Sequence, residues 1–284
     1  VFLGCGTAYH AGLVGKYMIE KFARVPVTVE IASEFRYSAP IITSSTLAVA
    51  ISQSGETTAT LAAVRYAKEH GATTIAITNV IGSSITREVD TTIYMPTGPE
   101  IAVAASKTYT SQLAILALFT LHLAIGRKQS TLETIKKPLH NLEDLPAQVE
   151  KVLAQSIFIQ DIAKRYSKFN QFLYLGRNIN YPVALEGALK LKEISYIHAE
   201  AHAAGEIKHG PMALIDSNMP VVCIATESNV YEKMLSNIQE VRARNAKIIA
   251  IATESDSEIG KLVEDAIYLP RIGEFASPIS VAVA

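Results

Sequence analysis

Short apolar runs alternate with amphipathic segments along the first half of the chain. Between the runs, apolar residues recur at the three- and four-residue spacing of a helix face. We expect strands at 1–3, 27–31, 47–51, 73–78 and 91–95, with helices that include 9–23 and 103–124. Strands that alternate with helices predict a parallel, doubly wound α/β sheet with right-handed crossovers.

The same pattern begins again near residue 172. Residues 172–176 repeat the strand and glycine turn of residues 1–4, and further strands are expected at 221–225 and 247–253. Adding 172 to first-half positions pairs Leu3 with Leu175, Gly4 with Gly176, Tyr9 with Tyr181 and Gly15 with Gly187, and a register of 174 pairs Tyr94 with Tyr268. We therefore expect two tandem copies of one α/β unit, related by an internal repeat.

The repeat also sets the expected domain boundaries. We place the first unit at 1–128, a polar helical connector at 129–171, and the second unit at 172–284. The second copy stops at the position equivalent to about residue 110 of the first (284 − 174 = 110), so we expect it to be incomplete at its C-terminal end. The chain begins inside a strand and without methionine, which favours a fragment of a longer protein.

A loop rich in hydroxyl groups follows the buried strand 47–51. Its residues are Ser52, Gln53, Ser54, Gly55, Glu56 and Thr57, and an amphipathic helix comes next. The first turn of a helix has unpaired N–H groups and the positive end of the dipole, and open α/β sheets bind ligands at the carboxyl ends of their strands. We therefore predict a phosphate site that needs no metal. The alternative is a serine that caps an ordinary helix.

The second copy differs at the corresponding place. Residues 225–228 read Ala-Thr-Glu-Ser, and Glu227 would repel a dianion. We expect one phosphate site, in the first copy.

Titratable residues gather in the second copy instead. Glu186, Lys190 and Glu193 share one face of a helix expected at 183–197, which is also typical of a solvated salt-bridge ladder. His198, His202 and His209 follow with two glutamates, and the His-x3-His spacing fits a helix face but lacks a third metal ligand at a familiar interval. We favour metal-free acid–base chemistry by Glu193 and His209, with a structural role for His209 as the alternative.

Composition restricts the function further. The 284 residues are 49% hydrophobic and 19% charged, with a formal net charge of −1, so nothing favours binding to nucleic acid or to an anionic membrane. The longest apolar run, 113–125, is too short to span a bilayer. Cys5 and Cys223 lack disulfide-like spacing, which fits a reducing cytoplasm, and each is either a small buried hydrophobe or a reactive thiol.

Taken together, these motifs identify a resemblance. The loop 52–57 resembles the phosphate loop of sugar isomerase (SIS) domains. The segments 30–37, 184–200, 205–211 and 237–244 are similar to the isomerase domains of glucosamine-6-phosphate synthases. The resemblance covers nearly the whole chain and implies two tandem SIS subdomains. It also implies a ketose–aldose isomerase that, without a cofactor, converts fructose 6-phosphate and glutamine-derived ammonia to glucosamine 6-phosphate.

The resemblance implies roles for particular residues. The phosphate is assigned to Ser52, Gln53, Ser54 and Thr57, and the sugar to Thr7 and Val103. Glu193 would move a proton between C1 and C2, and Lys190 would help to set its charge state. His209, supplied by the neighbouring subunit of a homodimer, would assist ring opening.

Three departures from the family pattern affect the expectation. Ala8 stands where the family often has serine, which removes one sugar contact. The family's N-terminal glutaminase domain and its C-terminal tail, whose lysine forms a Schiff base with the open sugar, lie outside this sequence, so we expect impaired turnover. The alternatives are a stand-alone SIS sugar-phosphate isomerase or deglycase and a non-catalytic sugar-phosphate sensor.

Overall fold

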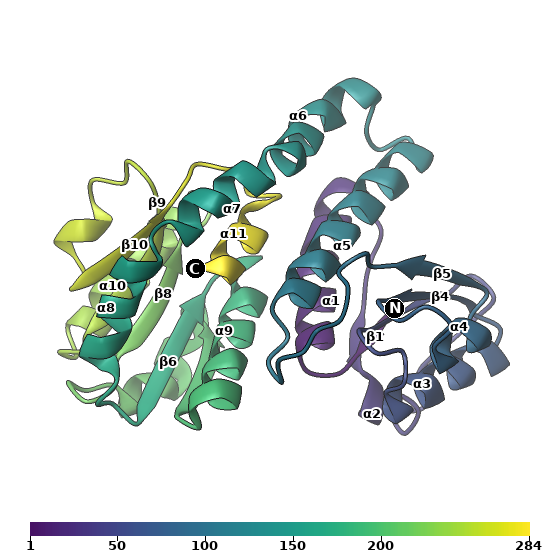
Figure 1. The fold of residues 1–284 in the computed structure, drawn as a ribbon, viewed down its shortest axis with the longest axis horizontal. Helices are drawn as coiled ribbons and strands as arrows, with labels where there is room; N and C mark the ends of the chain where they lie inside the picture. Colours follow the sequence, from purple (N-terminus) through teal and green to yellow (C-terminus); the bar gives the residue numbers. More distant parts are fainter. The chain divides into compact units, whose positions relative to one another are not determined.

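Each half of the chain folds around its own five-stranded parallel sheet (Figure 1). The computed structural model describes residues 1–284, and the chain divides into two compact units, Val1–Ile135 and Lys136–Ala284.

The first unit has the strand order β2-β1-β3-β4-β5. Its elements are β1 (Phe2–Gly4), α1 (Thr7–Phe22), β2 (Val29–Ile31), α2 (Ala32–Phe35), β3 (Leu47–Ser52), α3 (Thr58–Glu69), β4 (Thr73–Thr78), α4 (Ser84–Glu88), β5 (Thr91–Tyr94) and α5 (Lys107–Gly126). The order of the strands reverses between β1 and β3, and such a switch point opens a crevice at the carboxyl ends of the strands.

The second unit has the order β10-β9-β8-β6-β7. It contains most of α6 (Leu132–Glu143), followed by α7 (Leu145–Leu153), α8 (Ser156–Tyr166), β6 (Gln171–Gly176), α9 (Asn180–Ser195), β7 (His198–Ala203), two 3₁₀ turns η1 (Ala204–His209) and η2 (Pro211–Leu214), β8 (Val221–Ala225), α10 (Tyr231–Arg242), β9 (Ile248–Thr253), η3 (Ile259–Lys261), β10 (Asp265–Leu269) and α11 (Ser277–Val283).

The two sheets confirm the predicted fold and its repeat. Reading the second order from its other end gives β7-β6-β8-β9-β10, which matches the first sheet strand for strand. The helices correspond as well, with α9 after β6 as α1 follows β1, and α10 after β8 as α3 follows β3. Both units are therefore doubly wound parallel sheets.

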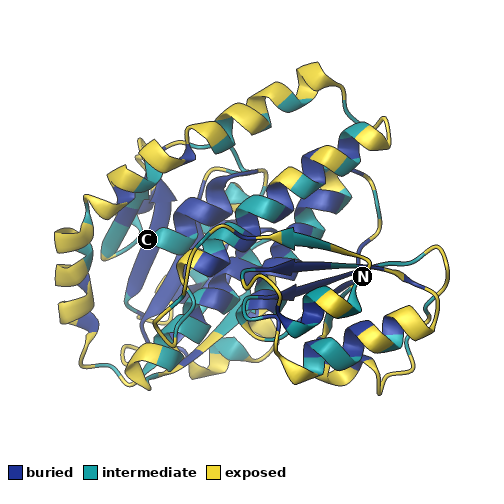
Figure 2. Ribbon diagram, turned by 45° about the vertical axis from the view of Figure 1, so that its right-hand side comes forward, coloured by how far each residue is buried: buried dark blue, intermediate teal, exposed yellow.

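Small residues let helices approach the sheets closely. In the first unit, Ala63, Val64 and Ala67 of α3 pack against Ala48 and Ala50 of β3. In the second, the core forms between the β8 and β9 strands and the apolar face of α10, through Val221, Cys223, Ile248, Met234 and Ile238. The central strands, such as β3, β8 and β9, are buried almost throughout, whereas the edge strands β2, β5 and β7 are mostly half-buried or exposed (Figure 2).

Helix α5 differs from the expectation in two ways. It begins at Lys107 rather than 103, because residues 96–106 form a loop whose Glu100 carboxylate accepts hydrogen bonds from the N–H and hydroxyl of Thr108, at 3.0 and 2.8 Å. It is also, by length and composition alone, long and apolar enough to cross a membrane. Leu113, Leu116 and Leu121 are buried, and α5 packs along α1, as the core helix of a globular unit does.

Strand β7 corrects a second expectation. The spacing of His198 and His202 fits a helix face, but the segment is an edge strand paired with β6. In a strand, residues 198, 200 and 202 share one face because side chains alternate, and their polar groups are exposed or half-buried there while Ala199 is buried.

Candidate functional site

The hydroxyl loop closes a tight turn at the carboxyl end of β3. Ser52 Oγ accepts a hydrogen bond from the N–H of Gly55 at 3.1 Å and lies 3.3 Å from Thr57 Oγ1. Ser54 Oγ accepts from the N–H of Glu56 at 3.2 Å. The carbonyl of Gln53 accepts from the N–H of Asn79 at 3.0 Å, so the turn is tied to the end of β4. These bonds fix several hydroxyl groups at the switch point of the sheet.

Glycine is required at the centre of this turn. Gly55 has a φ of +65°, in the left-handed region, and a Cβ placed there would lie 2.2 Å from Ser83 Oγ and 2.9 Å from Ile85 Cγ2. Its carbonyl accepts from the N–H of Ile85 at 3.0 Å. The loop therefore packs directly against the start of α4.

The first turn of α3 has no side-chain cap. Thr57 occupies the N-cap position, but neither its side chain nor a loop serine makes a capping hydrogen bond. The N–H groups of that turn lie at the positive end of the helix dipole and lack a side-chain acceptor. The serine cap of the alternative interpretation is therefore not formed. Helices α1, α4, α5 and α10 also begin without a side-chain cap, so the missing cap does not by itself identify a ligand.

A pocket of about 160 Å³ opens at this loop. Five of the residues predicted to bind substrate line it: Thr7, Ser52, Gln53, Ser54 and Thr57. Val103 does not line it, because it lies in the loop before α5 with 93% of its surface exposed. The pocket walls carry hydroxyl and amide groups, and no charged side chain lines them.

Three buried hydroxyl- or amide-bearing residues that line the pocket were not predicted. Thr60 reaches the pocket from α3, and Thr108 and Gln112 reach it from α5, one helical turn apart. For the two residues of α5, the only signal in the sequence was polar residues at a four-residue spacing on an otherwise apolar helix. A polar residue in such a pattern can be either buried or exposed, so the spacing alone does not identify a residue of the pocket.

Two of the predicted catalytic residues, Lys190 and Glu193, lie in the second unit, on α9. Lys190 Nζ lies 2.5 Å from Glu193 Oε2 and 3.3 Å from Glu186 Oε1. The three side chains are 21%, 29% and 4% exposed, so they form a partly buried cluster rather than the solvated ladder of the alternative interpretation. The shared ammonium restrains the Glu193 carboxylate while leaving one of its oxygens available.

His209 ends η1 and is exposed, next to Gly210 with its φ of +140°. On β7, Glu200 interacts with His198 and His202, each at 3.4 Å. No group of three or more His, Cys, Asp or Glu side chains is arranged to hold a metal ion.

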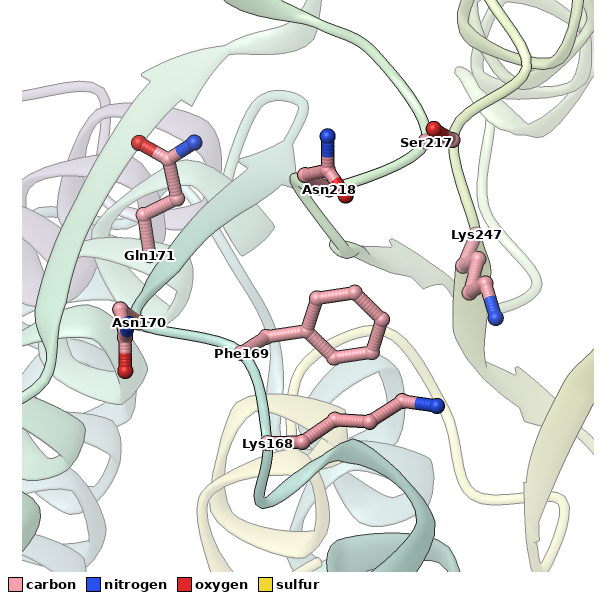
Figure 3. A pocket seen from close by; sticks show the side chains of 7 residues that line it. All are labelled: Lys168, Phe169, Asn170, Gln171, Ser217, Asn218 and Lys247. Carbon is pink, nitrogen blue, oxygen red and sulfur yellow. The ribbon is translucent and has the colours of Figure 1, made fainter.

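A larger hollow, of about 610 Å³, lies in the second unit, at the amino ends of the strands of its sheet (Figure 3). Its walls come from the segments that precede β6, β8 and β9, and the ammonium groups of Lys168 and Lys247 lie 5.6 and 5.4 Å from the Phe169 ring. Open α/β sheets bind their ligands at the carboxyl ends of the strands, and this hollow lies at the amino ends. The loop pocket is therefore the stronger candidate.

Sequence comparison defines the class of protein. The SIS domain model matches residues 1–122 and 166–281, and the chain belongs to the SIS domain family. Among curated proteins, it is 51% identical over 277 residues to a glutamine–fructose-6-phosphate aminotransferase (isomerizing) of Thermus thermophilus, covering 98% of this chain and 46% of that protein. It is 52% identical to the enzyme of the same name from Chlorobaculum tepidum, covering 97% and 45%.

Solved structures agree with this placement. The C-terminal domain of glucosamine-fructose-6-phosphate aminotransferase from Francisella tularensis has a TM-score of 0.94 at 41% identity, covering 99% of this chain and 81% of that one. A tagatose-6-phosphate ketose/aldose isomerase from Escherichia coli, at 18% identity and a TM-score of 0.77, shares the fold. The predicted family is confirmed, and the chain spans about half the length of the curated relatives it matches.

Proposed function

We propose that this chain performs the ketose–aldose isomerisation step in the synthesis of glucosamine 6-phosphate from fructose 6-phosphate and ammonia. The observation that carries the proposal is the hydroxyl loop at the carboxyl end of β3, which lines an uncharged pocket at the start of α3. Relatives that are about 50% identical in sequence are named glutamine–fructose-6-phosphate aminotransferases (isomerizing). A neutral cradle suits a phosphate monoester, because N–H and O–H donors bind the dianion without a metal.

In this proposal, the two ends of the substrate have separate partners. Ser52, Gln53, Ser54 and Thr57 bind the phosphate, and Thr7 contacts the sugar from the pocket wall. Val103 would contact the sugar from the exposed loop before α5, outside the pocket lining. The binding energy of the phosphate then orients the far end of the sugar for reaction.

The chemistry is assigned to Glu193. Moving a proton between C1 and C2 needs one carboxylate that reaches both adjacent carbons. Lys190 holds that carboxylate at 2.5 Å and so fixes its direction. His209, contributed by the neighbouring subunit of a homodimer, exchanges the proton that opens the ring.

The proposal also includes the oligomeric state, the cellular location and the source of ammonia. The homodimer would work in the cytoplasm, with ammonia supplied by a glutaminase domain of the longer enzyme.

The binding half of the proposal is tested with Ser54→Ala. Losing a hydroxyl that serves a charged group costs about 1.5–3 kcal/mol, so the Kd for fructose 6-phosphate should rise by about 10- to 150-fold. Ser228→Ala is the control, because Ser228 lies in the corresponding turn of the second copy, where no phosphate site is expected. Equal affinity in both variants would contradict the phosphate assignment.

The catalytic half is tested with Glu193→Gln. Exchange of the C1 hydrogens of fructose 6-phosphate with deuterium from D₂O, followed by NMR, should slow by at least about 100-fold, while binding persists. Glu232→Gln, at an exposed position on α10, should exchange like the parent protein. Exchange that survives in Glu193→Gln would exclude Glu193 as the base.

A further inference from the structure

Helix α5 carries three buried polar side chains, of which one lacks a partner. Thr108, Gln112 and Thr120 are each at most 1% exposed. The Thr108 hydroxyl donates to Glu100 Oε2 at 2.8 Å, and the Thr120 hydroxyl donates to the carbonyl of Leu116 at 2.7 Å. Gln112 Oε1 is buried and has no hydrogen-bond partner in the chain. Such a group is unusual in a folded protein, because the amide loses its hydration without compensation.

The position of Gln112 offers an explanation. Its side chain lines the same pocket as Thr7, Ser52 and Ser54. A threonine one turn earlier, Thr108, lines the pocket as well, but its hydroxyl already serves Glu100. Gln112 is therefore the polar group of α5 that is left for a ligand.

We propose that Gln112 is a further substrate-binding residue, and that its amide oxygen accepts a hydrogen bond from a sugar hydroxyl near the phosphate. This inference rests on the proposed function, since it takes the pocket ligand to be a hexose phosphate. A phosphate dianion offers acceptors only, whereas the unmet atom of Gln112 is itself an acceptor. Its partner must then be a donor, and the hydroxyl groups of the sugar supply one.

The variant Gln112→Met tests the assignment. Methionine keeps the length and volume of the side chain but removes the amide, so the fold should be retained. We expect the Kd for fructose 6-phosphate to rise about 10-fold, and the affinity for inorganic sulfate, which carries no proton, to stay within about twofold. Gln112→Asn keeps the amide but shortens its reach, and it should lose the same affinity.

The matched control is Gln148→Met. Gln148 of α7 also has an amide oxygen without a partner, but it does not line the pocket. Binding should be unchanged in this variant, which separates the loss of a ligand contact from the general effect of removing an unsatisfied amide.

The outcomes distinguish this inference from the proposed function. If Ser54→Ala weakens fructose 6-phosphate binding and neither Gln112 variant does, Gln112 is only a buried amide and the inference fails while the proposed function stands. If Gln112→Met weakens sulfate as much as fructose 6-phosphate, the assignment to a sugar hydroxyl is wrong. If Ser54→Ala leaves fructose 6-phosphate binding unchanged, the phosphate assignment itself fails.

Discussion

Replacing Gly55 by alanine should cost the first unit more than the same change at another left-handed glycine. At Gly55 the new Cβ would lie 2.2 Å from Ser83 Oγ, 2.7 Å from Ser83 Cβ and 2.9 Å from Ile85 Cγ2. At Gly82, whose φ is +73°, nothing lies within 4 Å of the new atom. The two sites thus share the backbone penalty and differ in the steric one.

The magnitudes follow from these two penalties. A left-handed conformation costs a residue with a Cβ about 1–2 kcal/mol, and overpacking a tight site costs about 1–3 kcal/mol more. We expect Gly55→Ala to lower the free energy of unfolding by about 2–5 kcal/mol and Gly82→Ala by about 1–2 kcal/mol. The entropy that alanine removes from the unfolded chain is the same in both and cancels in the comparison.

The assay should report the first unit alone. Because the chain divides into two compact units, a single melting temperature mixes their stabilities. Native-state hydrogen exchange of the β3 and β4 amides measures the free energy of opening of the first sheet directly.

A second substitution identifies the cause of the penalty. Ser83→Gly removes two of the three close atoms, so the double variant Gly55→Ala/Ser83→Gly should recover part of the loss as a coupling energy. Equal losses at Gly55 and Gly82, or no coupling with Ser83, would refute the packing of the loop against α4.

Two further predictions concern titration and thiol reactivity. The pKa of Asp90 is lowered to about 2, first by the N–H of Thr74 and then by Lys68 and the Thr74 hydroxyl. The folded pKa is depressed, so Asp90 contributes stability above about pH 4 that is lost as the pH falls through 2. The Asp90 side chain is 43% exposed, so solvent screening reduces its contribution to stability. We expect Asp90→Asn to lower the free energy of unfolding by about 1 kcal/mol at pH 7. Urea titrations should show that this difference from the parent protein shrinks as the pH falls toward 2. Burial raises the pKa of the Cys223 thiol, whereas Cys5 lines the loop pocket. A thiol reagent should therefore label Cys5 and leave Cys223 unmodified. Bound fructose 6-phosphate should slow the labelling of Cys5. Labelling of Cys223 in the folded chain, or of Cys5 at an unchanged rate with ligand, would contradict these positions.

Local features of the sequence were enough to predict the loop and most strands of the two sheets. The uninterrupted apolar run of β3, followed at once by Ser52 and Ser54, predicts both a buried strand and a polar turn at its carboxyl end. The repeat then predicts the second sheet, and in the structure the strand order of that sheet matches the order of the first.

What the sequence could not predict depends on contacts between distant residues. The start of α5 is set by Glu100, whose carboxylate binds Thr108 eight residues later. Gln112 lies in a largely apolar helix, and the sequence does not show whether its amide is buried or exposed to solvent. Only the folded structure shows that it is buried at the pocket. Strand β7 was missed because it has no apolar run, although alanine alternates there with His198, Glu200 and His202 as in an edge strand.

The central claim is that the turn after β3 holds the charged end of a hexose phosphate. Backbone amide NMR during titration with fructose 6-phosphate tests it most directly, with fructose as the control that lacks the phosphate. We predict shift changes at the amides of 52–60 with fructose 6-phosphate, and none there with fructose. Shift changes that appear instead around Lys168 and Lys247, with residues 52–60 unaffected, would contradict the account.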